Sequence, residues 1–169
     1  MLKTLLTLLG MLLALAVHAD SKSELRTRNE QLLARIAAAH GYSAEQMDRL
    51  RALLLGSPYM GQGNPDITVH ADSREACLAR SEAAPAPYPK DEFEKICGAA
   101  YMAPLYDPAK ESAQQARACI DQYEFPDIPC EYPVVWVKAR EAAEVCSALG
   151  KRLCDAHEWE GACDGALTA

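Results

Sequence analysis

The seven cysteines of this chain constrain its fold more than any other feature, and all of them follow an apolar N-terminal segment. This number is typical of chains that fold in an oxidising compartment, where cysteines pair as disulfides. Because seven is odd, at least one cysteine stays free, pairs with another molecule or pairs with sequence outside the chain. Disulfides are therefore expected to carry part of the stability.

The first nineteen residues predict an export signal. Lys3 precedes an apolar run from Leu5 to Val17, and the segment ends at Ala19 in the manner of a signal-peptidase site. The alternative is an uncleaved membrane anchor, but the run is shorter than the ~20 apolar residues that a bilayer span needs. We expect residues 1–19 to be removed, which leaves an exported protein, periplasmic or secreted, with no stable membrane span.

The charge of the chain argues against nucleic acid as a partner. The formal net charge is −7, and loss of Lys3 with the signal makes it more negative by one unit. Binding to a phosphate backbone depends on clustered basic side chains that release counterions, and an acidic chain supplies no such excess. The remaining length, about 150 residues, is enough for one domain with a modest core.

Residues 20–56 predict a helical hairpin. Ser43 and Gln46 form a capping box at the start of its second helix, which should end near Gly56. We expect a packed N-terminal appendage, and a coiled-coil or dimer contact is the alternative. The apolar residues of the first helix recur at helical spacing: Leu25, Leu32, Leu33 and Ile36.

Residues 57–96 predict a linker, because proline and glycine interrupt regular structure over much of this stretch. One short capped helix, signalled by residues 72–75, should carry Cys77. Beyond the linker we expect a helix over 91–97 that Gly98 closes. Strands are predicted over 118–125 and 133–137.

Two further helices are expected near residues 139–149 and 156–163. Gly150 should close the first, and Asp155 with Glu158 forms a capping box that opens the second. Trp159 in the second helix is expected to be a core anchor that packs on Leu149 and Leu153. His157 is expected to be an exposed residue of the first turn, and Lys151 with Arg152 a helix-end charge that forms salt bridges.

Three segments together resemble the formylglycine-generating enzyme family, also called the sulfatase-modifying factor family. They are IDQYE at 120–124, EYPVVWV at 131–137, and GKRL followed after four residues by EWE, ending at residue 160. The resemblance extends from Cys119 to Gly165. It implies an α+β domain of the C-type-lectin-like fold with much irregular structure, here partial and spanning 97–169.

The chain departs from the family pattern at several positions. Lys138 and Ala139 stand where the family usually has serine and tryptophan, Cys154 replaces a proline and Cys163 replaces an alanine. The first of these changes removes a hydroxyl cap from the helix that follows. The chain therefore resembles a divergent branch of the family.

The resemblance implies an oxygen-dependent enzyme that oxidises a cysteine of a protein or peptide substrate, with copper and calcium as cofactors of a complete domain. The paired copper-binding cysteines of the family match no position here, so we assign no catalytic, cofactor-binding or metal-binding residue. The chain, which ends at Ala169, is then expected to be the N-terminal part of the enzyme. The alternative is a non-catalytic lectin-like binding module of the cell envelope.

The cysteines allow two interpretations. The disulfide candidates are Cys119 with Cys130, which flank a proline-containing turn, and Cys77 with Cys97 as a second pair. The other interpretation is a small zinc module, because Cys-x2-His at the start of a helix can contribute to a tetrahedral site. Its four potential ligands are Cys146, Cys154, His157 and Cys163.

Overall fold

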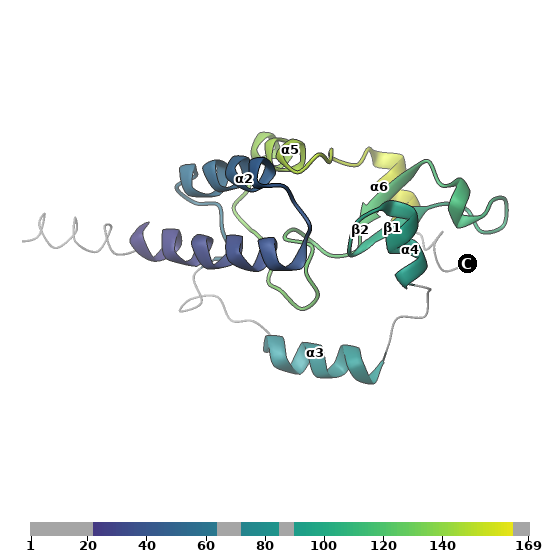
Figure 1. The fold of residues 1–169 in the computed structure, drawn as a ribbon, viewed down its shortest axis with the longest axis horizontal. Coiled ribbons are helices and arrows are strands. Elements are labelled where there is room, and N and C mark those ends of the chain that lie inside the picture. Colours follow the sequence, from purple (N-terminus) through teal and green to yellow (C-terminus); the bar gives the residue numbers. More distant parts are fainter. Residues whose placement is uncertain (1–21, 64–71, 85–89, 164–169) are drawn as a thin grey trace, which may run out of the picture.

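The computed structural model describes residues 22–63, 72–84 and 90–163. Within these ranges the chain forms six α-helices, one short 3-10 helix and one two-stranded antiparallel sheet, so the fold is mixed α+β. Figure 1 shows three helices grouped at one end of the molecule and the sheet at the other. The expected export signal and Gly165 lie outside the described residues.

The N-terminal hairpin consists of a helix over residues 22–39 and α2 (Ala44–Gly56). The predicted capping box is confirmed: Ser43 Oγ accepts from Gln46 N at 3.2 Å, and Gln46 Oε1 accepts from Ser43 N at 2.9 Å. Buried Asn29 donates from Nδ2 to the carbonyls of Leu54 and Met60, which fixes the end of α2 and the following turn against the first helix.

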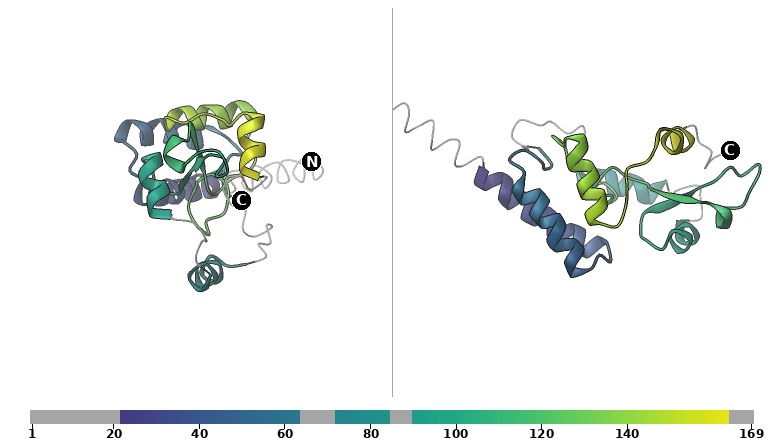
Figure 2. Two further views of the ribbon diagram at one scale, coloured as in Figure 1. Left: turned by 90° about the vertical axis from the view of Figure 1, so that its right-hand side faces the viewer. Right: turned by 90° about the horizontal axis from the view of Figure 1, so that it is seen from above.

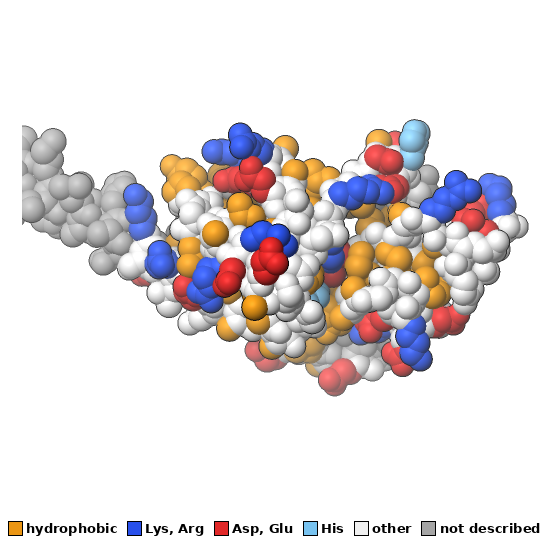
Figure 3. All heavy atoms as spheres, turned by 45° about the horizontal axis from the view of Figure 1, so that its top comes forward, with side chains coloured by type: hydrophobic (Ala, Val, Ile, Leu, Met, Phe, Trp, Pro, Cys, Tyr) orange, Lys and Arg blue, Asp and Glu red, His pale blue; other side chains and the backbone are white. Residues whose placement is uncertain are grey.

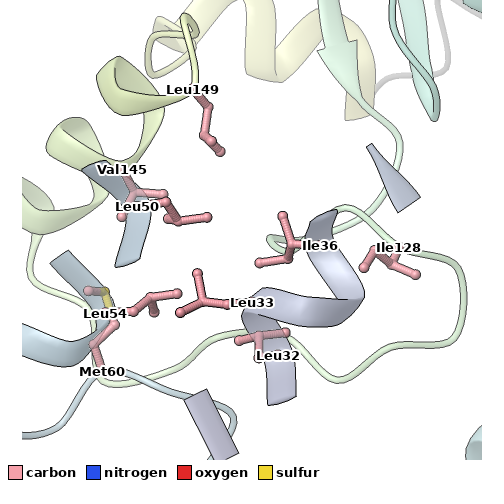
Figure 4. Close-up of a cluster of buried hydrophobic side chains, with 9 residues drawn as sticks. All are labelled: Leu32, Leu33, Ile36, Leu50, Leu54, Met60, Ile128, Val145 and Leu149. Atoms are coloured by element: carbon pink, nitrogen blue, oxygen red, sulfur yellow. The ribbon is translucent and has the colours of Figure 1, made fainter. Parts of the chain in front are cut away.

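The helix α5 (Ala139–Ala148) packs on α2 and completes a core that the hairpin alone would leave open. The predicted helix and its closing Gly150, with φ +76°, are confirmed. We call residues 22–63 together with α5 the helical region. Figure 4 shows its core, with Val145 and Leu149 lying beside Leu50. Ile128 and Leu149 from adjoining segments complete this core, whose buried apolar residues are Leu32, Leu33, Ile36, Leu50, Leu54, Met60, Ile128, Val145 and Leu149.

The opposite end is built from α4 (Lys90–Cys97), β1 (Met102–Leu105), a 3-10 turn (Ala113–Gln115) and β2 (Ala118–Asp121), which we call the sheet region. Met102 lies opposite Asp121 in the antiparallel pair, and Leu105 lies opposite Ala118. The predicted end of α4 at Gly98 is confirmed, with φ +71°. The core here is small, with three buried apolar residues: Phe93, Ala103 and Ala113.

Both predicted strands need correction. The strand expected over 118–125 ends at Asp121, because the chain then turns and Asp127 N donates to Glu124 O at 2.8 Å. Residues 133–137 form no strand of a sheet, and their ladder contact is a single bridge between Val135 and Gly61. Trp136 in this stretch is 74% exposed. Among the described residues, no neighbouring strand is long enough to pair with residues 133–137 over their length.

The described residues form two disulfides, and they join the four candidate cysteines in a different way from the one expected. Cys97 pairs with Cys119 and Cys77 pairs with Cys130, so the expected pairings Cys119–Cys130 and Cys77–Cys97 are wrong. Because α4 packs on β1, its last residue, Cys97, reaches Cys119 on the neighbouring strand, with 5.9 Å between Cα atoms. Short separation in sequence was a poor guide to proximity.

The helix α3 (Arg74–Ala83) carries Cys77, as the sequence predicted, and buries no residue. It is capped by Ser73, whose Oγ accepts from Ala76 N at 3.2 Å. Its covalent attachment is the disulfide to Cys130, and the Arg74–Glu131 ion pair at 3.7 Å adds a polar contact. Just before the helix, Tyr132 Oη donates to Asp72 O at 2.8 Å. Figures 1 and 2 show α3 standing apart from the other helices.

The last described helix is α6 (Ala156–Cys163). The predicted capping box is confirmed, since Glu158 N donates to Asp155 Oδ1 and Asp155 N donates to Glu158 Oε2, both at 2.9 Å. The expected packing of Trp159 is wrong: Trp159 is 61% exposed and Leu153 is 47% exposed, because the chain leaves the core after Leu149. None of the described helices is long and apolar enough to cross a membrane.

Candidate functional site

A groove of about 1210 Å³ lies where β2, the turn after α5 and the start of α6 meet. All four residues of β2 line it, together with the GKRL turn (Gly150 to Leu153) and Tyr42 from the helical region. In Figure 3 hydrophobic side chains gather over the sheet end, with basic and acidic side chains around them. The groove combines apolar walls, exposed Trp159 and paired charges.

Lys151 links the GKRL turn to β2. Its Nζ lies 2.5 Å from Asp121 Oδ1 and 3.6 Å from Asp127 Oδ2, and its side chain is 17% exposed. Burial alone would lower the pKa of Lys151, but the hydrogen bond to Asp121 and its charge outweigh burial and raise the pKa. The residue therefore stays a cation, and it holds two segments 30 residues apart.

Asp127 is a buried acid beneath the groove, and only 1% of its surface is exposed. Its Oδ1 accepts from Tyr123 N at 3.3 Å, whereas Oδ2 has no hydrogen-bond partner among the described residues and faces Lys151. Burial raises the pKa of Asp127 to about 8, and the nearby Asp121 carboxylate adds to this effect. Burial and the neighbouring carboxylate therefore both favour the protonated form of Asp127.

His40 and Tyr42 bring the helical region to the same cluster. Their rings stack with 5.0 Å between centroids, and the Lys151 Nζ lies 6.0 Å from the centre of the Tyr42 ring. Burial lowers the pKa of His40 and raises the pKa of Tyr42. His40 Nε2 lies 3.0 Å from Pro126 O, so the neutral imidazole can donate to this carbonyl next to Asp127.

Arg152 links the GKRL turn to the EWE segment, which follows it after four residues. Its guanidinium binds Glu158 with two hydrogen bonds, from Nη1 to Oε2 at 2.6 Å and from Nη2 to Oε1 at 2.5 Å. The bond to Arg152 lowers the pKa of Glu158 to about 2. The prediction that Lys151 and Arg152 form salt bridges is confirmed, and both cations of the motif serve the fold of the turn.

Four cysteines line the groove. Cys97 and Cys119 form their disulfide on its sheet side, and Cys146 and Cys154 are free thiols on the side of the GKRL turn. Cys146 is half-buried and Cys154 is exposed. Burial raises the pKa of each free thiol, so both are predominantly neutral near pH 7.

The potential metal ligands do not form a cluster in the part of the chain that is described, where no group of three or more His, Cys, Asp and Glu side chains could hold an ion. Cys146 and Cys154 line the groove, but the His157 side chain is 95% exposed and lies against Glu160. The side chain of Cys163 is not among those that the structure describes. The described side chains of Cys146, Cys154 and His157 therefore belong to no such group, and the zinc interpretation, which also involves Cys163, stays a prediction.

Comparison of the chain with family models, curated proteins and solved structures gives no match. The case for a site therefore rests on the geometry of the groove. Asp121 and Lys151 lie in the IDQYE and GKRL segments, but the sequence did not predict that they form an ion pair. Sequence reasoning singled out neither Asp127 nor Tyr42, because nothing in their sequence neighbourhood signals that they approach Lys151.

Proposed function

We propose that this chain is an exported member of the sulfatase-modifying factor family whose described part forms a scaffold and a groove for a protein or peptide partner. The observation that carries the proposal is the ion pair between Lys151 and Asp121. It joins two of the three segments on which the family resemblance rests, IDQYE and GKRL. Arg152 and Glu158 join GKRL to EWE in the same way.

The pairing matters because three sequence segments can match a family pattern independently of one another. In this chain Lys151 binds Asp121 and Arg152 binds Glu158, so charged residues of the segments themselves hold two of the three segments together. The two disulfides also fit a chain that folds in an oxidising compartment. These observations support the family and the export of the chain, which remain proposals.

Within the described residues the groove is better suited to binding than to catalysis. Its cations are engaged by carboxylates, and its free thiols have raised pKa values, so no activated nucleophile faces the groove. Exposed Trp159 and Leu153 offer the apolar contact that a partner would bury. The oxidation typical of the family would then need residues outside the described ranges.

The first experiment tests the division between binding and catalysis. The purified chain is incubated with Cu(I), oxygen and a cysteine-containing sulfatase-type peptide, and the peptide is then analysed by mass spectrometry. We expect no conversion of the cysteine to an aldehyde. Formation of formylglycine above the level of a heat-inactivated control would contradict the non-catalytic assignment while supporting the family.

The second experiment tests the groove. Trp136 does not line the groove and is 74% exposed, so the variant Trp136→Phe leaves Trp159 as the one tryptophan reporter. We expect the same peptide to shift or quench the Trp159 emission with saturable dependence on concentration. The matched variant Trp159→Phe, which retains Trp136, should show no saturable change. Equal responses from both variants, or none up to millimolar peptide, would contradict the groove as the binding site.

A lectin-like binding module of the cell envelope is the second candidate. The exposed aromatic ring of Trp159 above the charged residues of the GKRL turn favours it, since sugar rings commonly stack on such surfaces. The fluorescence experiment distinguishes the two candidates when the peptide is replaced by an oligosaccharide mixture. A saturable response to the sugars alone would favour the lectin-like module.

A further inference from the structure

We propose that Cys146 and Cys154 form a thiol–disulfide exchange site in the groove, which closes to a third disulfide when it meets the disulfide of another molecule. This inference stands apart from the family assignment, because it rests on the two free thiols and on the turn that joins them. Its substrate class is an accessible disulfide, of a small thiol compound or of a protein.

The geometry brings the two thiols to one surface. Cys146 lies in the last turn of α5, Cys154 follows the GKRL turn, and both side chains line the groove. The turn folds back on the helix, since Lys151 N donates to Cys146 O at 2.8 Å. Gly150 reverses the chain with φ +76°. The charge of a Cys154 thiolate is felt at Cys146, which contributes to its raised pKa.

The segment between the two cysteines can adjust to a bond. Residues 151–155 have no regular secondary structure, and Leu153 and Cys154 are exposed, so the backbone at Cys154 itself has few packed contacts. Lys151 and Arg152 hold the preceding turn through side-chain ion pairs. In contrast, Cys97 and Cys119 are held by α4 and β2, and their bond is already formed. The groove is therefore lined by one formed disulfide, Cys97–Cys119, and by two thiols, Cys146 and Cys154.

The exchange proceeds in two balanced steps. The thiolate of Cys154, the more exposed of the two, attacks one sulfur of the external disulfide, forms a mixed disulfide and releases one thiolate. The thiolate of Cys146 then attacks the Cys154 sulfur, forms the Cys146–Cys154 bond and releases the second thiolate. The dithiol loses two electrons to the external disulfide, and its two protons go to solvent or to the released thiolates.

Closing the bond would alter the wall of the groove. It ties the end of α5 to the residue before Asp155, and the loop it closes contains Lys151 and Arg152. Both cations hold their carboxylate partners from this loop. The oxidised chain would therefore present a more rigid GKRL turn to any partner than the reduced chain does.

The experiment uses the full chain and oxidised glutathione as the probe. The variant Cys163→Ser removes the remaining cysteine of the chain, so the bond can be assigned without ambiguity. After incubation and alkylation of remaining thiols, a tryptic digest without reductant is analysed by mass spectrometry. We expect peptides 141–151 and 153–169 to be recovered as one linked species. The linked peptides of the other two disulfides serve as the control for folding.

The rate should rise with pH, about tenfold per unit below the thiol pKa, because only the thiolate attacks. The matched variant Cys146→Ser, made in the same background, should stop at a mixed disulfide between Cys154 and glutathione. A stable mixed disulfide on Cys154 in the chain that retains Cys146 would overturn the proposal, because it would place Cys146 out of reach. So would two alkylated thiols after prolonged incubation at pH 8.5 with the control bonds intact.

Discussion

The helical region and the sheet region reach stability by different means. The core of the helical region contains nine buried apolar residues, including Ile128 and Leu149 from adjoining segments, and no disulfide joins two segments of the region itself. The core cluster of the sheet region contains three buried apolar residues, with Pro104 of β1 also buried, and the Cys97–Cys119 bond crosses from α4 to β2. Figure 2 shows the two regions at opposite ends of the molecule. The difference teaches that this chain places covalent links where apolar burial is smallest.

The helix α3 is the extreme case of this contrast between apolar burial and disulfides. It buries no residue, and Cys77–Cys130 is its covalent attachment to the rest of the fold. In the chain-entropy view, a disulfide limits the freedom of the unfolded chain and so substitutes for contacts that the folded state lacks. A fold that depends on such a disulfide would fit the proposed export of the chain to an oxidising compartment.

The largest expected effect is loss of a large side chain from the helical core. Leu33 is 1% exposed and packs between the two hairpin helices, so Leu33→Ala should lower the free energy of unfolding by ~2–5 kcal/mol through lost burial and a residual cavity. Denaturant unfolding followed by circular dichroism measures the change. The control Leu153→Ala removes a side chain that is 47% exposed and should cost much less. Equal losses in both variants would contradict a core centred on Leu33.

Removal of the Cys97–Cys119 bond should have the next largest effect, and it should be confined to the sheet region. For a separation of 22 residues the chain-entropy model gives a loss of ~3 kcal/mol for the double variant Cys97→Ser with Cys119→Ser. Proteolysis of α4 and β2, mapped by mass spectrometry, measures it. The matched variant Cys77→Ser with Cys130→Ser should release α3 and leave β1 and β2 protected, and cleavage of β2 in this control would contradict the contrast.

The smallest effect concerns the buried acid between the two regions. Burial raises the pKa of Asp127 to about 8, so between its ordinary pKa and pH 8 the folded chain binds a proton that the unfolded chain releases. Stability therefore falls as the pH rises through this window. Relative to Asp127→Asn, the unmodified chain should lose up to ~2.5 kcal/mol between pH 5 and pH 7, because each of these two pH units contributes at most ~1.4 kcal/mol.

Denaturant unfolding at several pH values tests this prediction. The control is Asp107→Asn, because Lys110 lowers the pKa of Asp107, and the stability this acid contributes is lost only when the pH falls below its ordinary pKa. That variant should keep the same difference from the unmodified chain at pH 5 and at pH 7. A pH-independent difference for Asp127→Asn as well would show that Asp127 is ionised in the folded state.

The parts of the fold predicted from sequence are those that depend on neighbouring residues. Ser43 with Gln46 and Asp155 with Glu158 form the predicted caps, because these bonds need only three residues of helix. Gly98 ends its helix as expected, since a positive φ has a local cost that glycine avoids. Local signals of this kind located the helices of the described ranges well.

The parts that sequence reasoning missed depend on distant segments. Met102–Leu105 was not predicted as a strand, because Pro104 argues against one and the partner strand lies beyond a long loop. The disulfide partners follow from the packing of α4 on β1, which no spacing reveals. The groove likewise depends on Lys151 meeting Asp121 across 30 residues, so its residues were named in motifs without being joined.

Hydrogen exchange of the same chain before and after reduction tests the contrast between the two regions most directly. The account predicts that a reductant abolishes the protection of amides in β1, β2 and α4 and leaves those of α2 and α5 protected, because the helical core has no disulfide to lose. Simultaneous loss of protection in α2, α5 and the sheet would contradict it, since one cooperative unit would then depend on the disulfides throughout. Unchanged protection of β1 and β2 after full reduction would contradict it equally.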